Sequence, residues 1–301
     1  MNQAITAPGS LAAYAGVARA PFLLLPVTLV AVGTGAAAQL GMTDLIQAGI
    51  ALLGMLGAHI AVNALNEASD YKTGIDLRTQ RTPFSGGSGT LPAGALSGRT
   101  AFAVGLAGGA VAVAVGFYFL TVVGWQLVPI LVVGSVAIFV YTEVLARLYV
   151  GELFAGLGLG ALPIIGTALV QTMGYETVAV AASLPAFFMT FNLLLLNEFP
   201  DEAADRWGGR RNLVLLLGRK RAALLYSLFA IAVPAWLAVA VALGYLPTIA
   251  LAAIVPSLIF LAPPLRWALG SAQDPVPHPA LGANVAWNLT TNLVLAAALF
   301  L

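Results

Sequence analysis

The sequence of 301 residues lacks cysteine altogether, and charged residues make up only 8% of it. Without cysteine, disulfide bonds, thiolate metal sites and thiol nucleophiles are excluded. Because 60% of the residues are hydrophobic, a fold that hides its apolar surface from water is excluded as well. We therefore expect an integral membrane protein whose solvent is the lipid bilayer. The net charge of +1 gives no indication of a nucleic-acid partner, and we expect none.

Long apolar segments recur along the whole chain. A helix needs about 20 mainly apolar residues to cross the hydrocarbon core of a bilayer. The sequence therefore predicts an all-α integral membrane protein with nine transmembrane helices in a single domain over 1–301. Residues 1–18 contain no Lys or Arg, so they do not resemble a signal peptide, and we expect the first span to be retained. The nine segments lie near 17–38, 45–66, 99–119, 122–142, 151–170, 178–198, 222–242, 246–264 and 280–300.

The positive charges are distributed unevenly between the two sides of such a chain. All 13 Lys and Arg residues fall on one side of the nine spans. Since positive charges near span ends accumulate on the cytoplasmic side, we expect a cytoplasmic N-terminus and an external C-terminus. Two cytoplasmic loops, 67–98 and 199–221, are longer than the others, and functional residues concentrate in loops. We expect the site there, in a multi-pass protein of a prokaryotic inner membrane.

The first of these loops opens on an acidic cluster. Asn66 and Asp70 are four residues apart, so on a helix they share one face. Gly74 can end that helix and let Asp76 fold back toward the other two side chains. We therefore expect Asn66, Asp70 and Asp76 to lie together.

The second loop repeats this pattern at the end of the sixth predicted span. Asn197, Asp201 and Asp205 are again spaced by four residues. Pro200 removes a helix hydrogen bond, so we expect it to kink or restart the helix just before Asp201 and to leave Asp201 and Asp205 on one face. One such motif is usually a solvated helix end. Two of them on one membrane face, in a chain with only 12 acidic residues, indicate a functional site.

Paired carboxylates at a membrane surface favour a divalent metal and a phosphorylated ligand. Mg²⁺ prefers oxygen ligands and usually lies between one or two carboxylates and substrate phosphates. We therefore expect four aspartates to hold Mg²⁺ and to bridge it to a lipid diphosphate: Asp70, Asp76, Asp201 and Asp205. Basic side chains close to them in sequence can pair with the same phosphate oxygens; they are Lys72, Arg78, Arg81, Arg210 and Arg211.

These motifs resemble those of the UbiA superfamily of intramembrane prenyltransferases. The resemblance is carried by "NEASDYKTGID", by "NEFPDEAADRWGGRRNLVLLLG" and by "YTEVLARLYVGELFAGLG" after the fourth span. It implies a helical bundle around a central cavity with a lateral opening to lipid, in which Mg²⁺ ionises a polyprenyl diphosphate. By this analogy Asn66 and Asn197 join the four aspartates in binding the metal-diphosphate unit, and the phosphates are contacted by Lys72, Arg78 and Arg210.

The spacing within the first motif is similar to one branch of this family. Five residues separate Asp70 from Asp76, as in the menaquinone-pathway branch of 1,4-dihydroxy-2-naphthoate prenyltransferases, whereas three are typical of the hydroxybenzoate branch. The segment "GELFAGLGLGALPIIGTALVQT" also resembles the menaquinone branch. In contrast, Glu143-Val144-Leu145 stands where a Pro-rich turn is common. The resemblance implies transfer of a polyprenyl group to a small aromatic acceptor, a quinone precursor.

Loss of diphosphate would leave an allylic carbocation that water quenches, so the reaction needs a dry cavity with groups that stabilise positive charge. Tyr149 is a candidate for cation–π contact. Glu152 is expected to face the bundle interior and to orient the acceptor hydroxyl or act as a base, unless it only stabilises a helix N-terminus. His59 is expected to be a packing residue outside the site. Further aromatic candidates are Tyr118, Tyr141, Phe188 and Phe191.

Two other functions use similar residues. A membrane terpene cyclase would use the same metal cradle and would close the cation within one molecule. A solute transporter would use intramembrane acids for ion coupling, but such acids tend to lie near the midplane, whereas these lie at the cytoplasmic ends of the spans. The sequence therefore favours prenyl transfer, with the cyclase as the nearest alternative.

Overall fold

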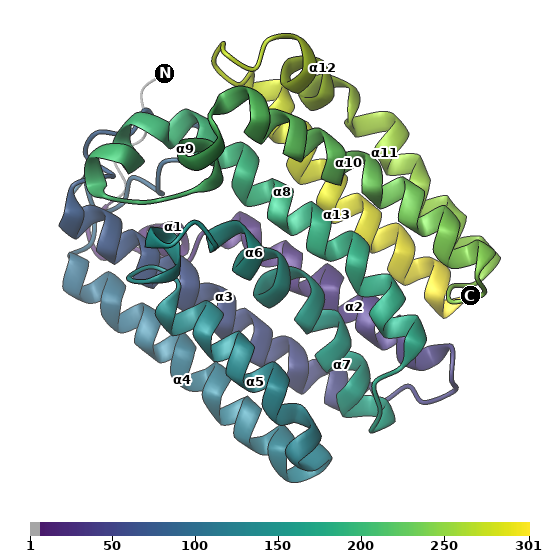
Figure 1. Ribbon diagram of the computed structural model, residues 1–301. Coiled ribbons are helices and arrows are strands. Elements are labelled where there is room, and N and C mark those ends of the chain that lie inside the picture. The colour runs from purple at the N-terminus through teal and green to yellow at the C-terminus, as the bar shows by residue number, and fades with distance from the viewer. Residues whose placement is uncertain (1–6) are drawn as a thin grey trace.

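The structure is a computed structural model that describes residues 7–301, and within this range it contains helices and no strand. The expected all-α class is confirmed. Short 3₁₀ and π-helical turns join several of the α-helices into longer segments (Figure 1). The helices are α1 Leu11–Val17, α2 Leu24–Ala38, α3 Leu45–Thr73, α4 Gly98–Val123, α5 Val128–Ser135, α6 Gly151–Gly156, α7 Leu162–Thr172, α8 Thr177–Gly208, α9 Leu213–Leu217, α10 Arg219–Ala242, α11 Val255–Phe260, α12 Ala262–Gly270 and α13 His278–Phe300.

The helical segments make this a multi-pass membrane protein. Among the described residues, seven segments are long and apolar enough to cross a bilayer, or eight if the pair Thr248–Phe260 and Ala262–Gly270, bent by 55°, forms one more. This count is lower than the nine spans expected from the sequence. One reason is that Gly98–Val140, 43 residues long, counts as a single segment. It nevertheless folds back on itself, because α4 and α5 lie side by side (Figure 1).

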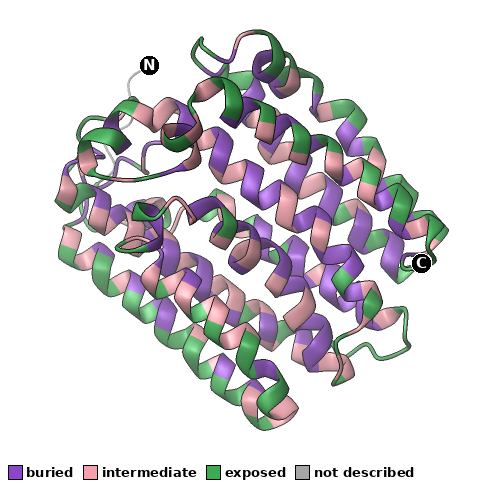
Figure 2. Ribbon diagram, viewed as in Figure 1, coloured by how far each residue is buried: buried purple, intermediate pink, exposed green. Residues whose placement is uncertain are grey.

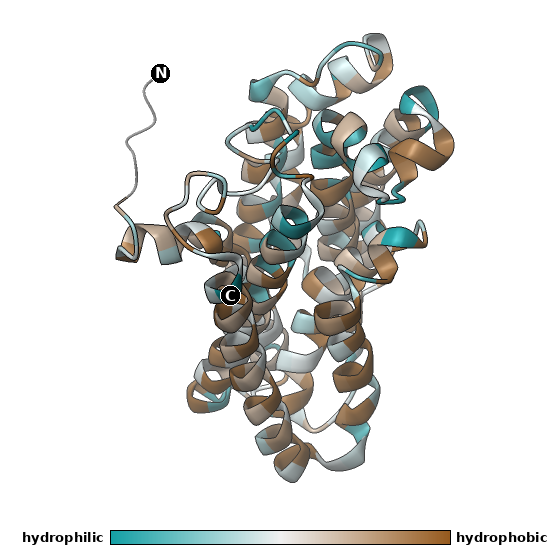
Figure 3. Ribbon diagram, turned by 90° about the vertical axis from the view of Figure 1, so that its left-hand side faces the viewer, coloured by the Kyte–Doolittle hydropathy of each residue, from teal (hydrophilic) through white to brown (hydrophobic). Residues whose placement is uncertain are grey.

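The bundle has a buried interior and a lipid-like exterior. Buried residues concentrate on α2, α8 and α13, while α4 and α5 form an outer layer with many exposed side chains (Figure 2). The exposed side chains of α4 are largely apolar, including Phe102, Leu106 and Phe117. Hydrophilic residues gather toward one end of the bundle, and the rest of its length is predominantly hydrophobic (Figure 3). This distribution is the one that a bilayer imposes on a helical bundle.

Small residues bring neighbouring helices into close contact. A Cβ atom added at Gly57 of α3 would lie 2.7 Å from the carbonyl oxygen of Gly108 in α4, and one added at Gly108 would lie 2.7 Å from the carbonyl oxygen of Gly57. Without hydrophobic attraction between helices in lipid, such close backbone packing is a main source of association. The interface of α3 and α4 therefore depends on these two glycines.

The two motif helices, α3 and α8, carry the acidic clusters and are the longest helices in the structure. Their ends differ from what the sequence predicts. The expected loops 67–98 and 199–221 begin as helix, because α3 continues to Thr73 and α8 continues to Gly208. Several polar side chains of these ends are buried in the protein, among them Asp70 and Asp205, so the helices extend beyond their apolar parts. Gly74 ends α3 in the left-handed conformation, as expected, and Gly209 does the same for α8, each with a φ of 79°.

Of the two effects expected of Pro200, a kink or a restart of the helix, the restart is absent, because α8 runs without a break from Thr177 to Gly208, with Pro185 and Pro200 both inside it. In a membrane bundle, neighbouring helices and side chains satisfy the backbone groups that a proline leaves free. Near Pro200, Nη1 of Arg219 also donates to the carbonyl oxygen of Phe199 at 3.2 Å. The shared face of Asp201 and Asp205 is preserved.

Candidate functional site

A cavity of about 180 Å³ lies between the two motif helices at the polar end of the bundle. Its walls come from α2, α3, α6 and α8, and the segment 84–87, in the loop that follows α3, also lines it. The polar side chains belong mainly to the motif ends of α3 and α8. Its remaining surface is apolar and includes Leu25, Val62, Ala137, Leu159 and Leu194. The cavity therefore combines a charged region with a hydrophobic region.

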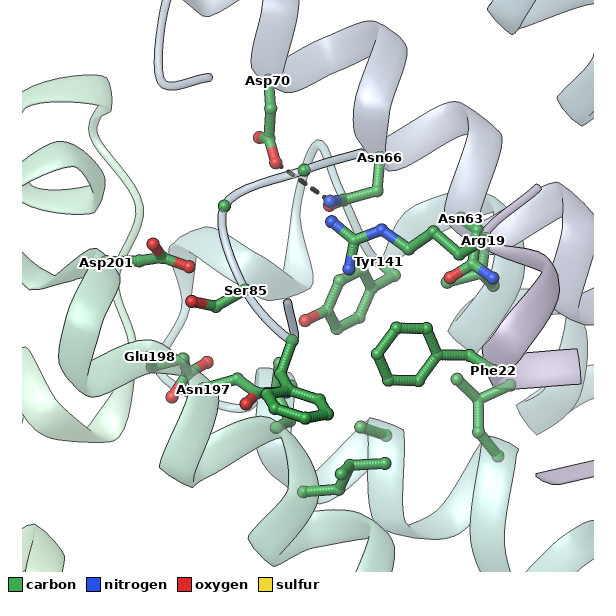
Figure 4. Close-up of a pocket in the computed structure, with 18 of the residues that line it drawn as sticks. Arg19, Phe22, Asn63, Asn66, Asp70, Ser85, Tyr141, Asn197, Glu198 and Asp201 are labelled. Atoms are coloured by element: carbon green, nitrogen blue, oxygen red, sulfur yellow. Dashed lines mark hydrogen bonds between the residues drawn. The ribbon is translucent and has the colours of Figure 1, made fainter. Parts of the chain in front are cut away.

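All six residues of the two acidic clusters line this one cavity, and Figure 4 labels four of them, Asn66, Asp70, Asn197 and Asp201. The spacing of four residues places Asn66 and Asp70 on one face of α3 and the second cluster on one face of α8, while Asp76 follows the turn at Gly74. Asp70, Asp76 and Asp205 are buried, with relative exposures of 7%, 4% and 4%. The juxtaposition expected from the sequence is present in the structure. The six residues are Asn66, Asp70, Asp76, Asn197, Asp201 and Asp205.

Arg210 connects the two clusters. Its Nη2 atom donates to Asn66 Oδ1 and to Asp70 Oδ1, both at 2.5 Å, and its Nε lies 4.0 Å from Asp205 Oδ1. Burial alone would lower the pKa of Arg210, but the carboxylates of Asp70 and Asp205 raise it above its ordinary value. Asn212 holds the other oxygen of Asp205 with a hydrogen bond of 2.9 Å. Arg210 thus neutralises part of the acidic charge and fixes α3 relative to α8.

The carboxylate of Asp76 has no partner comparable to Arg210 among the described residues. Its Oδ2 atom is buried and has no hydrogen-bond partner among the described residues, and its carboxylate lies against the backbone of Gly87. Burial, together with the charges of Asp70 and Glu67, raises the pKa of Asp76 to about 7. A carboxylate oxygen in this situation needs a cation or a proton.

The donor chemistry of the cavity fits Mg²⁺ that is shared with a ligand. Carboxylate oxygens are its preferred protein ligands, and five carboxylates line this space, those of the four aspartates and of Glu198. Within residues 7–301, no three acidic or histidine side chains converge closely enough to form a metal site alone. The remaining coordination positions would have to come from water or from ligand phosphates, as is usual for Mg²⁺.

Comparison with known proteins gives the family. The family model of the UbiA prenyltransferase family matches residues 24–278. The chain belongs to the UbiA prenyltransferase family. In sequence, the chain is 29% identical over 185 residues to the 1,4-dihydroxy-2-naphthoate octaprenyltransferase of Bacillus subtilis. That match covers 60% of the chain and 58% of the relative, so it spans less than two thirds of the relative's length.

Solved structures show the same UbiA fold. A UbiA homologue from Archaeoglobus fulgidus, bound to DMAPP and Mg²⁺, has a TM-score of 0.63 and 18% identity over 95% of this chain and 98% of its own. The apo UbiA homologue from Aeropyrum pernix K1 has a TM-score of 0.69 and 20% identity over 92% of this chain and 96% of its own. At these identities the likeness establishes the fold alone.

The other basic residues expected at this UbiA site lie outside the cavity. Lys72 is exposed, and Arg78 stacks on the ring of Trp207 at 3.4 Å. Arg81 packs against Gly89 in the loop after α3. Arg211 lies 5.9 Å from the ring of Tyr149, which is also outside the cavity. These residues surround the polar end of the bundle without lining the cavity.

Glu152 lies behind the cavity wall. It is fully buried, and its Oε1 accepts a hydrogen bond of 2.6 Å from the backbone N–H of Leu213, so it does not serve simply as an N-terminal carboxylate of α6. Its neighbour Glu198 does line the cavity and lies within hydrogen-bonding reach of Glu152. The structure therefore places Glu198 between Glu152 and the cavity.

Sequence reasoning missed several residues that line the cavity. Arg19 points into it from the turn after α1 with a φ of 51°, an uncommon conformation for a residue with a side chain (Figure 4). The sequence does contain a signal for Arg19, because it is the only charged residue among the first 43. His59, which we had placed outside the site, also lines the cavity. Phe84 and Ser85 were missed because nothing in a glycine-rich loop indicates which side chain turns inward.

Proposed function

We propose that this protein transfers a polyprenyl group from a prenyl diphosphate to a small aromatic acceptor, a quinone precursor, within the membrane. The observation that carries this proposal is that both acidic clusters and Arg210 face one cavity that also has an extensive apolar region. Such a cavity suits a substrate with a charged head and a hydrocarbon tail. The name of the Bacillus subtilis relative supports a dihydroxynaphthoate as the acceptor and an octaprenyl chain as the donor group.

Mg²⁺ would be held by the carboxylates of Asp70, Asp76, Asp201 and Asp205. When bound, it supplies positive charge that stabilises a leaving diphosphate. Asn66 and Asn197 carry amide groups suited to orienting the phosphate oxygens. Arg210 is already bound to Asn66 and Asp70, so it keeps the clusters in place before any ligand arrives. The homologue bound to DMAPP and Mg²⁺ supports this pair of ligands.

The apolar region of the cavity protects the reacting carbon. An allylic cation survives only where water is excluded, and aromatic faces stabilise it. Tyr141, Phe22 and Phe154 line the cavity and offer such faces, whereas Tyr149 lies outside it. Glu152, through its neighbour Glu198, would accept the proton that the acceptor releases.

A second, larger cavity of about 290 Å³ offers a place for the prenyl chain. It is lined almost entirely by apolar residues from α3, α4, α5 and α7. Leu159 lines both cavities, so the second begins where the first ends. A hydrocarbon chain attached to a diphosphate at the acidic clusters would extend past Leu159 into this space.

The basic residues outside the cavity would form a positive rim around its entrance. Exposed positive charges raise the local concentration of an anionic ligand and speed its capture. The anionic head of a prenyl diphosphate would be drawn to this rim before it reaches Arg210. The rim consists of Lys72, Arg78, Arg81 and Arg211.

We also propose that the chain crosses a prokaryotic inner membrane nine times as one domain. Contacts of Gly109 with Phe139 and of Gly116 with Leu131 support two crossings within Gly98–Val140. The bent pair of helices would supply the remaining crossing. The charge distribution supports a cytoplasmic N-terminus and site and an external C-terminus.

The decisive test is an incubation of the purified protein with Mg²⁺, labelled octaprenyl diphosphate and 1,4-dihydroxy-2-naphthoate. We expect a prenylated product that depends on Mg²⁺. Replacement Asp70→Asn or Asp201→Asn should reduce its formation by at least about 100-fold, because each removes a carboxylate that would hold the Mg²⁺ needed by the leaving diphosphate. Glu143→Gln is the matched control, since Glu143 is an exposed acid outside the cavity.

Three outcomes would contradict the proposal. Full activity of Asp70→Asn and Asp201→Asn would show that the acidic clusters do not hold the metal and diphosphate. A cyclised hydrocarbon from the diphosphate alone would make the protein a cyclase. The absence of any product from either substrate mixture would exclude both reactions.

A further inference from the structure

A second polar level lies deeper in the cavity than the acidic clusters. His59 of α3 lies seven residues before Asn66, and Thr190 of α8 lies seven residues before Asn197. Seven residues correspond to two helical turns, so each side chain shares the face of its motif and lies about 10 Å below it. Both residues are buried, and both line the cavity. Each motif helix thus carries acidic side chains near the polar end of the bundle and one uncharged polar side chain two turns deeper.

The hydrogen bonding of His59 determines which of its nitrogen atoms is available. Its Nδ1 lies 3.0 Å from the carbonyl oxygen of Met55. A carbonyl oxygen accepts only, so Nδ1 must carry the hydrogen, and in the neutral ring Nε2 is left with a lone pair. Nε2 is buried and has no partner among the described residues. An unpaired buried acceptor is unfavourable, so Nε2 requires a donor from a ligand.

We infer that His59 Nε2 accepts a hydrogen bond from a hydroxyl group of the aromatic acceptor and thereby orients its ring; this inference rests on the proposed function. The prenyl chain is a hydrocarbon and offers no donor. The diphosphate would be bound two turns higher, by the aspartates. A phenolic or naphtholic O–H is the remaining ligand group that matches Nε2. Thr190 Oγ1, which accepts from Asn288 Nδ2 at 3.5 Å, retains its own hydrogen for a second oxygen of the same ring.

The aromatic surroundings fit this inference. Phe22, Tyr141 and Phe84 line the cavity together with His59. Flat aromatic faces bind an aromatic ring, and one polar atom then fixes its rotation within the plane. His59 is therefore a positioning residue that selects the orientation in which the ring meets the prenyl carbon.

The test compares 1,4-dihydroxy-2-naphthoate with its methyl ethers, which keep the ring and lack the O–H donor. With wild-type protein, the ethers should have kcat/KM values about tenfold lower than the dihydroxy compound. In His59→Leu this preference should disappear, the KM for the dihydroxy compound should rise about tenfold, and the KM for prenyl diphosphate should stay within about twofold. His59→Gln, whose amide oxygen again accepts, should restore part of the preference.

Folding is controlled separately. Ser227→Ala removes a buried polar group from α10, whose hydroxyl bonds only within its own helix to Ala223, so it reports the general cost of such a change. The inference would be overturned if His59→Leu kept the wild-type preference for the dihydroxy compound over its ethers. An equal rise of the KM values for the acceptor and for prenyl diphosphate would also overturn it. Calorimetric titration of the protein with dihydroxynaphthoate, in the absence of prenyl diphosphate, measures the same contact without catalysis. Equal affinity of wild type and His59→Leu there would also overturn it, whereas absent turnover by wild type would count only against the proposed function.

Discussion

Arg210 shows how a buried cluster of acids is kept together in a membrane protein. One guanidinium group contacts Asn66, Asp70 and Asp205, which belong to the two motif helices. The charge-assisted hydrogen bond from Arg210 to Asp70 is stronger than a neutral one. Protein contacts alone therefore hold the two acidic clusters together around the position proposed for the diphosphate.

Arg19 is expected to contribute to substrate binding. It faces the same cavity and, unlike Arg210, forms no ion pair with a described residue. Asn63 donates to the carbonyl oxygen of Ala18 at 3.0 Å and so holds the turn that carries Arg19. Arg19→Gln should reduce kcat/KM for prenyl diphosphate by about 10- to 100-fold, the loss expected for a hydrogen bond to a charged group. Arg99→Gln, at the exposed start of α4, is the control. Wild-type kinetics of Arg19→Gln would refute this role.

Asp76 makes the stability of the metal-free protein depend on pH. Its pKa in the folded protein is about 7, above the ordinary value of 3.8, so the folded state binds the proton more tightly than the unfolded state. The resulting contribution is fully present below pH 3.8 and is lost as the pH rises through 7. Thermal unfolding in detergent with a chelator, between pH 5 and pH 8, should therefore occur at lower temperatures as the pH rises. Asp76→Asn should weaken this dependence; an unchanged slope would contradict the assignment.

At the scale of elements, α3 and α4 depend on two glycines that leave no room for a side chain. Gly57→Ala places a methyl group 2.7 Å from the carbonyl oxygen of Gly108, so α4 must move away. We expect the free energy of unfolding to fall by about 1–3 kcal/mol, as for other overpacked contacts. Gly49→Ala in the same helix meets nothing within 4 Å and should be neutral or slightly stabilising. Unfolding in mixed micelles measures the free energy of unfolding of both variants. Equal losses in Gly57→Ala and Gly49→Ala would exclude the proposed close contact.

The elements were largely predictable from the sequence, because apolar segments of about 20 residues have few alternatives in a bilayer. The expected span 45–66 corresponds to the first part of α3, and 222–242 lies within α10. The helix ends were less predictable. The apolar part of each sequence segment ends at the membrane boundary. In contrast, α3 and α8 continue as helix beyond it, because the protein buries several of the polar side chains there.

The site was predictable only where residues recur at helical spacing. The two Asn-x-x-x-Asp motifs indicate a shared face, and the structure brings both to one cavity. Arg19 and Phe84 come from a turn and a loop, whose inward-facing side chains depend on tertiary packing. Lys72 lies on α3 two residues after Asp70, so it is on another face of the helix, and Arg78 follows the turn at Gly74; neither lines the cavity. Proximity in sequence to a motif is thus a weaker guide than shared helical periodicity.

At the scale of the whole molecule, the absence of cysteine allows a direct test of orientation. Met42 is exposed in the turn between α2 and α3, and Gln273 is exposed between α12 and α13. With an impermeant thiol reagent on intact cells, Met42→Cys should be labelled and Gln273→Cys should not. Permeabilised cells should show labelling of both, and the cysteine-free parent is the control. The reverse pattern would invert the proposed topology.

Leu159 belongs to the charged cavity and to the apolar cavity, and this shared position separates two tasks of the protein. In the proposed reaction, the carboxylates would act on the head of the donor whatever the length of its tail. The apolar space beyond Leu159 contains none of the acids and would receive only the tail. Substitutions there can change which chain lengths are accepted while the chemistry stays intact. A lineage can therefore adapt to new isoprenoid donors by altering one wall, without passing through inactive intermediates.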